Sequence, residues 1–509
     1  MDSLGSLVGI LRALVRSPLV HVRLLVETPE AWIPVAIGLV LLAIAWALDR
    51  HRAADVRMHR RFEILVGIAG AAFLVWFVHG GSFPWTEGDW REEWVFFSAW
   101  KEALLDGRLP YYLTTTMQGT ERYFANLQTP LMPYSPLLAP LSVNVFVTAH
   151  LSLVFAVGFA GLVRLRRFFD LAALPWLLLV ILFTLNGHIV AHLSAGHLPW
   201  VAYYLMPWVF VAAVTLVSDE RSGQVFAFGA AVFGGMILIG GWHVFMWSLL
   251  FVNVVTAVSS RPIATLAGLG VATVLLVAVR LFPGVVTFGG GTNTFMGGFD
   301  SVGAMLTSLV DVPPESSLFD KWELDTYVGY GGVALICLGL VPFAHKPWRR
   351  LNRMLWPSAL LAVLAYRSVY GMTLFRLPGF VSERVATRFL IVPVLWLIVV
   401  GTARFSVWWR RQTQTWTTAG TVWLASAFLW LQLMLRAHSW RPHAGDPSAV
   451  LPSGIVKPMP VEAAYWWAFW IGVVTTAVVA TALGRSLWLA RSGQLRRAAR
   501  INASMYADR

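Results

Sequence analysis

The sequence predicts an all-α polytopic membrane protein, a helical bundle that crosses the bilayer about 12–13 times. Of its 509 residues, 57% are hydrophobic and only 13% are charged, whereas a soluble domain carries about a quarter charged residues. Apolar runs of roughly 18 or more residues recur along the chain, and each is long enough to cross the hydrocarbon as a helix. The 26 Trp residues fit this class, because Trp is enriched at membrane–water interfaces.

The expected spans follow the apolar runs in order. They are 30–49, 62–79, 138–163, 171–187, 198–217, 225–241, 242–259, 263–281, 327–344, 353–366, 389–405, 416–436 and 463–484. We divide the chain into an N-terminal interfacial segment and extra span (1–61), a transmembrane core (62–405), and C-terminal spans with a basic tail (406–509). Within the first part, residues 6–26 are expected to form an amphipathic interfacial helix.

Lys and Arg residues orient the bundle. If every span crosses, the basic loops all fall on one side, which the positive-inside rule assigns to the cytoplasm. These loops contain Arg50, Arg57, Arg60, Arg61, Arg164, Arg166, Arg167, Arg221, Arg261, Lys346, Arg349, Arg350, Arg410, Arg411 and Arg485. The long loops fall on the opposite side: 80–137, 282–326, 367–388 and 437–462. Long ordered outer loops indicate that the working face of the protein is extracytoplasmic.

Charge and cysteine content exclude other classes. The net charge of +13 is interpreted as basic cytoplasmic loops, and no nucleic-acid partner is expected because no binding motif accompanies the charge. Cys337 is the only cysteine, so the chain can form neither an intrachain disulfide nor a cysteine metal site. No cleavable signal peptide is evident, because Arg12, Arg16 and Arg23 interrupt the first apolar stretch.

The first outer loop carries the strongest chemical signal. Gly88-Asp89 follows span 62–79, and Trp94, Phe97, Trp100 and Leu104 have the spacing of a helix that ends at Asp106-Gly107. This segment is predicted to be an interfacial helix. A carboxylate beside an apolar wall can have its pKa raised by desolvation, and it can then act as a general base or bind a divalent metal.

The acids of this loop are weighed differently. Glu92 and Glu93 are interpreted as solvated. Asp89 is singled out as a candidate for chemistry, because it lies between Gly88 and Trp90 where the span ends.

Several short motifs occur in a fixed order along residues 62–405. They are Gly88-Asp89, Gly107-Arg108-Leu109-Pro110, Gly119, Ala125-Asn126-Leu127-Gln128, Pro133-Tyr134, Ser194-Ala195-Gly196-His197, Tyr327-Val328-Gly329 and Arg384-Val385-Ala386-Thr387-Arg388-Phe389. In this order they resemble the GT-C-type bacterial membrane glycosyltransferases, in particular the YfhO-like group. The chain departs from the larger members because it has no sizeable C-terminal soluble domain, and span 30–49 precedes the usual first helix.

The resemblance implies a GT-C-like bundle in the bacterial cytoplasmic (inner) membrane. It implies transfer of a sugar from a polyprenyl-phosphate donor to a cell-envelope acceptor at the outer face, with membrane lipid as a further partner of the protein. It makes Asp89 the expected base or metal ligand, with Glu87 as a second candidate catalytic carboxylate and a divalent metal (Mg²⁺ or Mn²⁺) as a candidate cofactor. Asn126 and Gln128 are candidates for binding substrate.

Two further clusters are candidates for ligand binding. Arg384 and Arg388 are four residues apart, which on a helix would place them on one face. We expect them to bind the lipid phosphate, since the guanidinium fork suits phosphate; the alternative is snorkelling to the interface. Arg376 is a weaker third candidate for this role.

His188, His192 and His197 cluster at an outer turn, and His243 could join them. His192 and His197 are candidates for contacting substrate; the alternative is simple hydrogen bonding at the interface. Zinc is disfavoured because no Glu accompanies the pair as in a metalloprotease helix. Glu323 and Asp325 are secondary acid candidates.

A transporter or flippase for a lipid-linked sugar is the alternative function. Such a protein is expected to carry polar or charged residues in the middle of its spans. The span interiors here are nearly free of charge, and Arg280 lies at a span end. This pattern favours chemistry at the outer surface.

Overall fold

The structure is a computed structural model that describes residues 30, 32–51, 56–114, 120–217, 222–257, 262–287, 294–311, 321–343, 346–377, 380, 382–412, 415–443 and 455–507. The predicted amphipathic helix at 6–26 lies outside these residues.

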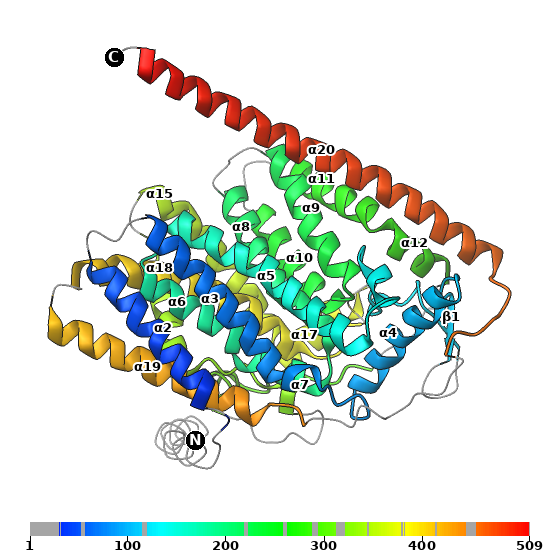
Figure 1. The fold of residues 1–509 in the computed structure, drawn as a ribbon, viewed down its shortest axis with the longest axis horizontal. Helices are drawn as coiled ribbons and strands as arrows, with labels where there is room; N and C mark the ends of the chain where they lie inside the picture. The colour runs from blue at the N-terminus through cyan, green and yellow to red at the C-terminus, as the bar shows by residue number, and fades with distance from the viewer. Residues whose placement is uncertain are drawn as a thin grey trace.

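Helices dominate the described chain (Figure 1). The α-helices are α2 Trp32–Arg50, α3 Val56–Phe77, α4 Trp90–Leu105, α5 Val143–Phe169, α6 Ala173–Leu185, α7 Gly187–Ala195, α8 Met206–Val217, α9 Ser222–Leu238, α10 Trp242–Ala257, α11 Pro262–Leu276, α12 Ala278–Thr287, α13 Val302–Thr307, α14 Gly329–Leu340, α15 Lys346–Arg349, α16 Leu355–Leu364, α17 Arg367–Met372, α18 Ile391–Gln412, α19 Trp416–Ser439 and α20 Ala463–Ala507. The 3₁₀ helices are η2 His79–Gly81, η3 Ser135–Leu138, η4 Leu198–Leu205, η5 Lys321–Glu323, η6 Arg350–Met354, η7 Leu374–Arg376 and η8 Ala386–Leu390.

Long apolar helices make this a multi-pass membrane protein. Among the described residues, seven helices are long and apolar enough to cross a bilayer. The helices Leu266–Leu276 and Ala278–Thr287 meet at a bend of 82°, and if this pair counts as one broken span the number is eight. The seven are Trp32–Arg50, Val143–Phe169, Ala173–Ala195, Leu198–Val217, Ala386–Gln412, Trp416–Ser439 and Ala463–Leu489. Every predicted span coincides with a helix, but several of these helices are shorter, so the number 12–13 stays a prediction.

Two predicted spans differ from the structure. The span predicted at 171–187 breaks at Asn186 and continues as α7 to Ala195, and the Asn186 side chain caps α7 by accepting from Ile189 N at 3.3 Å. The span predicted at 263–281 is not straight, because it turns between α11 and α12. This turn brings the Arg280 side chain to the carbonyl groups of the first outer loop.

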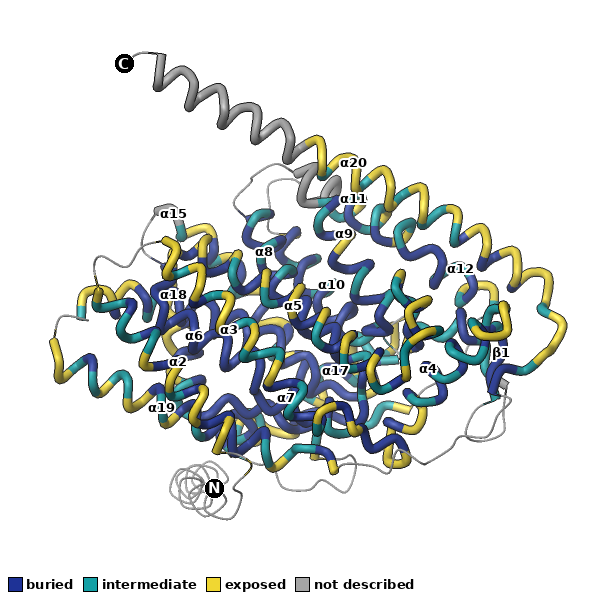
Figure 2. Tube along the Cα trace, viewed as in Figure 1, coloured by how far each residue is buried: buried dark blue, intermediate teal, exposed yellow. Residues whose placement is uncertain are grey.

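Helix α6 forms the centre of the bundle. All of its residues are buried, and it packs against α2, α18 and α19. Figure 2 shows burial concentrated in the middle of the molecule and exposed positions along the peripheral helices α2, α19 and α20. Large apolar side chains are exposed there, including Ile33 on α2 and Val474 and Val478 on α20. Exposed apolar surface of this extent is expected of helices that contact lipid.

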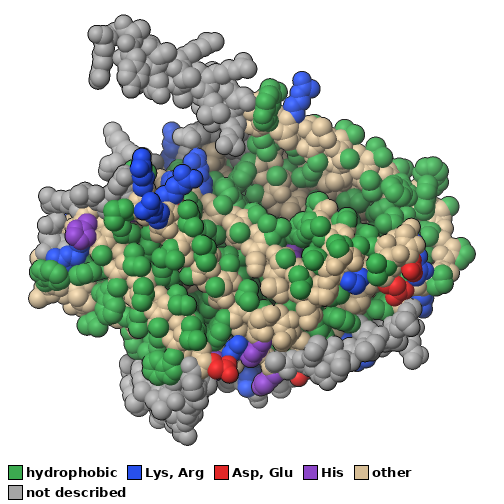
Figure 3. Space-filling view, in the orientation of Figure 1, with side chains coloured by type: hydrophobic (Ala, Val, Ile, Leu, Met, Phe, Trp, Pro, Cys, Tyr) green, Lys and Arg blue, Asp and Glu red, His purple; other side chains and the backbone are tan. Residues whose placement is uncertain are grey.

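Basic side chains meet at one end of α6. Asp49 caps the helix by accepting hydrogen bonds from Ala173 N (2.7 Å) and Leu174 N (2.8 Å). Beside this cap, Arg166 contacts Glu63 at 3.0 Å. Lys and Arg side chains gather in this part of the molecule, near α15 and the start of α3, and a band of hydrophobic side chains lies below them (Figure 3). Described parts of three loops predicted to share the cytoplasmic side, near Glu63, Arg166 and Arg410, thus lie together.

The predicted first outer loop folds against the opposite end. The helix predicted in this loop is present as α4, and its position at the membrane interface stays a prediction. It is followed by a hairpin of β1 (Tyr112–Thr114) and β2 (Thr120–Arg122), antiparallel with Leu113 opposite Glu121. Leu113 also pairs with Val456 in the segment before α20. This pairing joins the hairpin to the segment before α20, and Ile455 N of that segment donates to Glu102 Oε2 on α4 at 3.1 Å.

Candidate functional site

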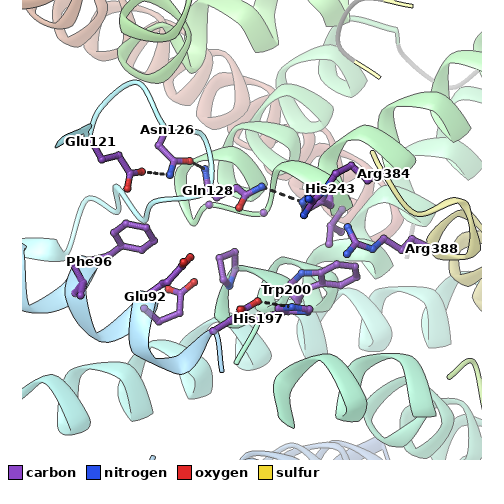
Figure 4. A pocket seen from close by; sticks show the side chains of 17 residues that line it. Glu92, Phe96, Glu121, Asn126, Gln128, His197, Trp200, His243, Arg384 and Arg388 are labelled. Atoms are coloured by element: carbon purple, nitrogen blue, oxygen red, sulfur yellow. Dashed lines mark hydrogen bonds and ion pairs between the residues drawn. The ribbon is translucent and has the colours of Figure 1, made fainter. Parts of the chain in front are cut away.

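A polar cavity of about 360 Å³ opens where five segments distant in sequence meet. The segments are the start of α4, the loop after β2, the turn that opens η4, the turn that opens α10, and the strand-like segment before η8. Figure 4 shows the labelled side chains pointing toward a common space, with Glu92, Phe96 and Glu121 on one side and His243, Arg384 and Arg388 on the other. The cavity is therefore acidic on one wall and basic on the other.

Asp89 and His197 form a carboxylate–imidazole contact on the floor of the cavity. Asp89 precedes the first residue of α4, and its Oδ2 lies 2.7 Å from His197 Nε2. The hydrogen bond from His197 is the main reason that the pKa of Asp89 is lowered. Asp89 is therefore ionised throughout the neutral pH range.

A close backbone approach creates this contact. Gly196 ends α7 with φ +98°, a left-handed conformation that suits glycine. A Cβ at Gly196 would lie 2.3 Å from Trp90 N, so only glycine lets α7 come this near to α4. Trp90 Nε1 then donates to Ser194 O at 3.0 Å and joins the two helices.

A stack of aromatic rings supports His197 from below. His192 Nδ1 lies 2.7 Å from His197 Nδ1, so one of these two nitrogens donates to the other. The His192 ring is buried and stacks on Trp200 with centroids 3.7 Å apart. His188 and His192 do share a face of α7, with ring centroids 4.6 Å apart. His192 thus reaches the cavity through His197 and does not line it.

The two arginines lie on the basic wall, but not on one helix face. Arg384 is in extended backbone before Val385, and only Arg388 lies in η8, so the expectation of a shared helical face is wrong. The reason is that Val385 pairs with Gly297 as an isolated bridge, which keeps this segment extended. Both side chains nevertheless line the cavity.

Arg388 is already paired. Its Nε donates to Glu323 Oε2 at 2.8 Å, its Nη2 donates to Oε1, and its guanidinium lies 5.0 Å from the Trp200 ring centroid. Burial alone would raise the pKa of Glu323, but the Arg388 charge lowers it. Arg384 is exposed, and the described part of the chain shows no carboxylate within salt-bridge distance of it. Among the described residues, Arg384 is thus the cation of this wall that has no carboxylate partner.

A second imidazole faces the cavity from α10. His243 Nδ1 donates to Glu383 Oε1 at 2.6 Å, and Trp247 Nε1 donates to Glu383 Oε2 at 2.9 Å. Burial opposes ionisation of Glu383, but the His243 contact lowers the pKa of this carboxyl. With Nδ1 engaged, His243 presents Nε2 to Gln128, whose Nε2 lies 3.2 Å away.

Arg280 fixes the loop that carries Asn126 and Gln128. Its guanidinium is fully buried and donates to Asn126 O, to Thr129 O at 2.8 Å and to Thr129 Oγ1 at 2.8 Å. The Asn126 amide donates to Glu121 Oε1 and its Oδ1 accepts from Gln128 N at 2.8 Å. Arg280 therefore fixes the part of the cavity wall that carries Asn126 and Gln128.

The acidic wall is less solvated than the sequence indicates. Glu92 is exposed, but Glu93 is only 6% exposed, so its interpretation as a solvated residue is wrong. The physical reason is helical spacing: Glu93 shares the inward face of α4 with the buried Trp90, Phe97 and Trp100. Burial raises the pKa of Glu93 well above its ordinary value, and the nearby charges of Asp89 and Glu92 raise it further.

The structure brings six of the eight candidate site residues to one cavity. These are Asp89, Asn126, Gln128, His197, Arg384 and Arg388. His192 lies behind them, and Glu87 is exposed and does not line the cavity. Of the secondary candidates, Glu323 pairs with Arg388 and Asp325 pairs with Arg436. The spacing of α4 could have identified Glu93, whereas no local signal points to the His243–Glu383 pair or to Trp200.

No metal-ligand cluster is seen in the described ranges. No three His, Cys, Asp or Glu side chains there converge in a way that could hold a metal ion. The candidate cofactor Mg²⁺ or Mn²⁺ stays a prediction.

Comparison of the chain with family models, curated proteins and solved structures finds no match. The fold and the site together define a multi-pass α-helical membrane protein with a charge-divided polar cavity at one end of its bundle.

Proposed function

We propose that this protein is a membrane glycosyltransferase that moves a sugar from a polyprenyl-phosphate donor to an acceptor hydroxyl at the outer face. One observation carries the proposal. Asp89 and Arg384, 295 positions apart in the sequence, line the same small cavity with a carboxylate–imidazole contact on its floor. Base, imidazole and free guanidinium are the groups that this transfer needs.

The chemistry assigned to the cavity is one displacement. Asp89 accepts the proton of the acceptor hydroxyl, and the hydroxyl oxygen attacks the anomeric carbon of the donor sugar. The bond between that carbon and the phosphate oxygen breaks, and its electron pair leaves with the lipid phosphate. Arg384, which has no carboxylate partner among the described residues, neutralises the charge gained by the phosphate. The configuration at the anomeric carbon inverts.

His197 supports the base. By donating from Nε2 it keeps Asp89 ionised and holds the carboxylate in place, ready to accept the proton. His192 sets which nitrogen of His197 carries hydrogen, through the 2.7 Å contact between their Nδ1 atoms. His192 is thus a positioning residue.

A transporter fits the structure less well. The polar groups occur at the two ends of α6, with Asp49 and Arg166 at one end and the cavity at the other. Between them α6 is wholly buried and, apart from Thr184, apolar. A solute crossing the bilayer would need a polar path past this helix.

The first test is Asp89→Asn. We expect at least about a 100-fold loss of sugar transfer, within the range for loss of a general base, with an unchanged midpoint of thermal unfolding in detergent. Asp106→Asn removes an exposed acid of the same loop outside the cavity and serves as the matched control. Transfer by Asp89→Asn at the level of the control would contradict the role of Asp89.

The second test is Arg384→Ala, measured as the dependence of transfer on donor concentration. We expect a raised apparent KM for the lipid donor and the same stability, because Arg384 is exposed. Arg367→Ala, at an exposed arginine outside the cavity, is the control. An unchanged KM in Arg384→Ala would refute phosphate binding by Arg384.

A further inference from the structure

Glu93 is a buried carboxylate that lacks a counter-charge in the described structure. Its residue is 6% exposed, yet it lines the cavity. Neither a hydrogen bond nor an ion pair to its carboxylate is found in the described ranges of the chain, and every influence on its pKa raises it. A carboxylate in this position is costly unless a cation arrives to pair with it.

Two further carboxylates lie on the same wall. Glu121 lines the cavity from β2, and the Asn126 amide is its one hydrogen-bond donor among the described residues. Glu92 lies next to Glu93 on α4. Burial raises the pKa of both groups. The buried Phe96 lines the cavity beside them (Figure 4) and offers an aromatic surface to a cation.

The basic side chains that line the cavity do not pair with the carboxylates of this wall in the described structure. Arg388 is bound to Glu323, and His243 is bound to Glu383. Arg384 lies on the opposite side in Figure 4. The cavity is thus complementary to a small ligand that carries a negative group toward Arg384 and a positive group toward Glu93.

We propose that the acidic wall of Glu92, Glu93 and Glu121 binds a primary ammonium group of a phosphate-bearing ligand. If the proposed glycosyl transfer holds, on which this assignment of the source rests, the ligand is a lipid-phosphate-linked amino sugar with a free amine. The same chemistry is found in a phosphoethanolamine lipid headgroup. A primary ammonium has three hydrogens that reach separate acceptors, so it does not need the convergent ligands of a metal ion, an arrangement that the described residues do not show.

The test is calorimetric titration of the full chain in maltoside detergent. The ligands are glucosamine 1-phosphate, its N-acetylated counterpart and phosphoethanolamine. For the wild-type chain we expect the free amine to bind about 30-fold more tightly than the N-acetyl form, as for a buried charge pair. Binding should also release protons, seen as a heat that depends on the buffer, because Glu93 must ionise to pair with the ammonium.

Glu93→Gln should abolish both the preference for the amine and the proton release. The variant is expected to fold, since the change removes a desolvated carboxylate that has no partner in the described structure. Glu121→Gln is a second variant that should weaken the preference. Glu462→Gln, whose side chain is 58% exposed and outside the cavity, is the matched control.

Each outcome decides a separate point. Tighter binding of phosphoethanolamine than of glucosamine 1-phosphate, lost in Glu93→Gln, supports the ammonium site and identifies a lipid headgroup as its source. Equal binding of the amine and its N-acetyl form to the wild-type chain overturns the inference. Binding of Mn²⁺ that depends on Glu93, without a preference for the amine, also overturns it. An amine preference in a chain that transfers no sugar contradicts the proposed function alone.

Discussion

Replacing Gly196 with alanine should separate the two groups on the cavity floor. A Cβ at this position would lie 2.3 Å from Trp90 N and 2.8 Å from Asp89 C. Ordinary contact begins at about 3.4 Å, so the start of α4 must move by roughly 1 Å. That shift lengthens the 2.7 Å contact between Asp89 and His197 to about 3.7 Å, which is beyond a hydrogen bond.

The expected losses of stability and of sugar transfer follow from this displacement. A left-handed conformation costs an alanine about 1–2 kcal/mol relative to glycine, and the clash adds to this. A misplacement of about 1 Å in a catalytic group can reduce turnover by about 100-fold. We therefore expect Gly196→Ala to lower the unfolding midpoint and to reduce transfer by about two orders of magnitude.

Gly107→Ala provides the matched control. Gly107 has φ +63°, but an added Cβ would meet nothing within 4 Å. It therefore carries the conformational cost without the clash. Thermal unfolding followed by Trp fluorescence and transfer from the lipid donor would be measured for both variants. If Gly196→Ala loses no more stability than Gly107→Ala and keeps its activity, the close approach of α7 to α4 is not what places Asp89.

Two further predictions concern the paired groups. Arg388→Ala leaves Glu323 buried without a counter-charge and should cost about 3–5 kcal/mol of stability. The double change Arg388→Met with Glu323→Leu should restore most of the folded protein, measured by size-exclusion chromatography. If it does not, the pair does more than balance charge. His197→Gln should move the acid limb of the pH–rate profile upward, because the pKa of Asp89 then returns toward its ordinary value near 3.9. In the wild-type chain the contact contributes stability above that value, and this is lost as pH falls through the lowered pKa of Asp89. An unmoved acid limb would show that Asp89 is not the titrating base.

Local patterns in the sequence predicted the helices but not their partners. Apolar run length located the helices at the predicted spans, and the spacing from Trp94 to Leu104 located α4, which begins earlier than this spacing indicates, at Trp90. The backbone conformation of the segments that line the cavity was harder to predict. The Arg384–Arg388 spacing indicated a helix, but the bridge between Gly297 and Val385 keeps the segment extended. A single sequence does not encode such a pairing across the chain.

The partners of the buried charged groups could not be predicted from local sequence patterns either. Glu323 meets Arg388 across 65 positions, and His243 meets Glu383 across 140 positions. Both acids are therefore committed to ion pairs, although sequence alone made Glu323 a candidate for chemistry. Only the position of Glu93 on the inward face of α4 was open to prediction, from its spacing to Trp90 and Phe97.

The apolar length of α6 also separates the cavity from the charged groups at the other end of this helix. Because every residue of α6 is buried and all but Thr184 are apolar, protons have no polar route along it between Asp49 and the carboxylates around Asp89. Along this helix, the ionisation of the cavity is therefore uncoupled from the opposite end of the bundle. In a cell that maintains different pH values across the membrane, the ionisation of Glu93 would respond to the compartment that the cavity faces.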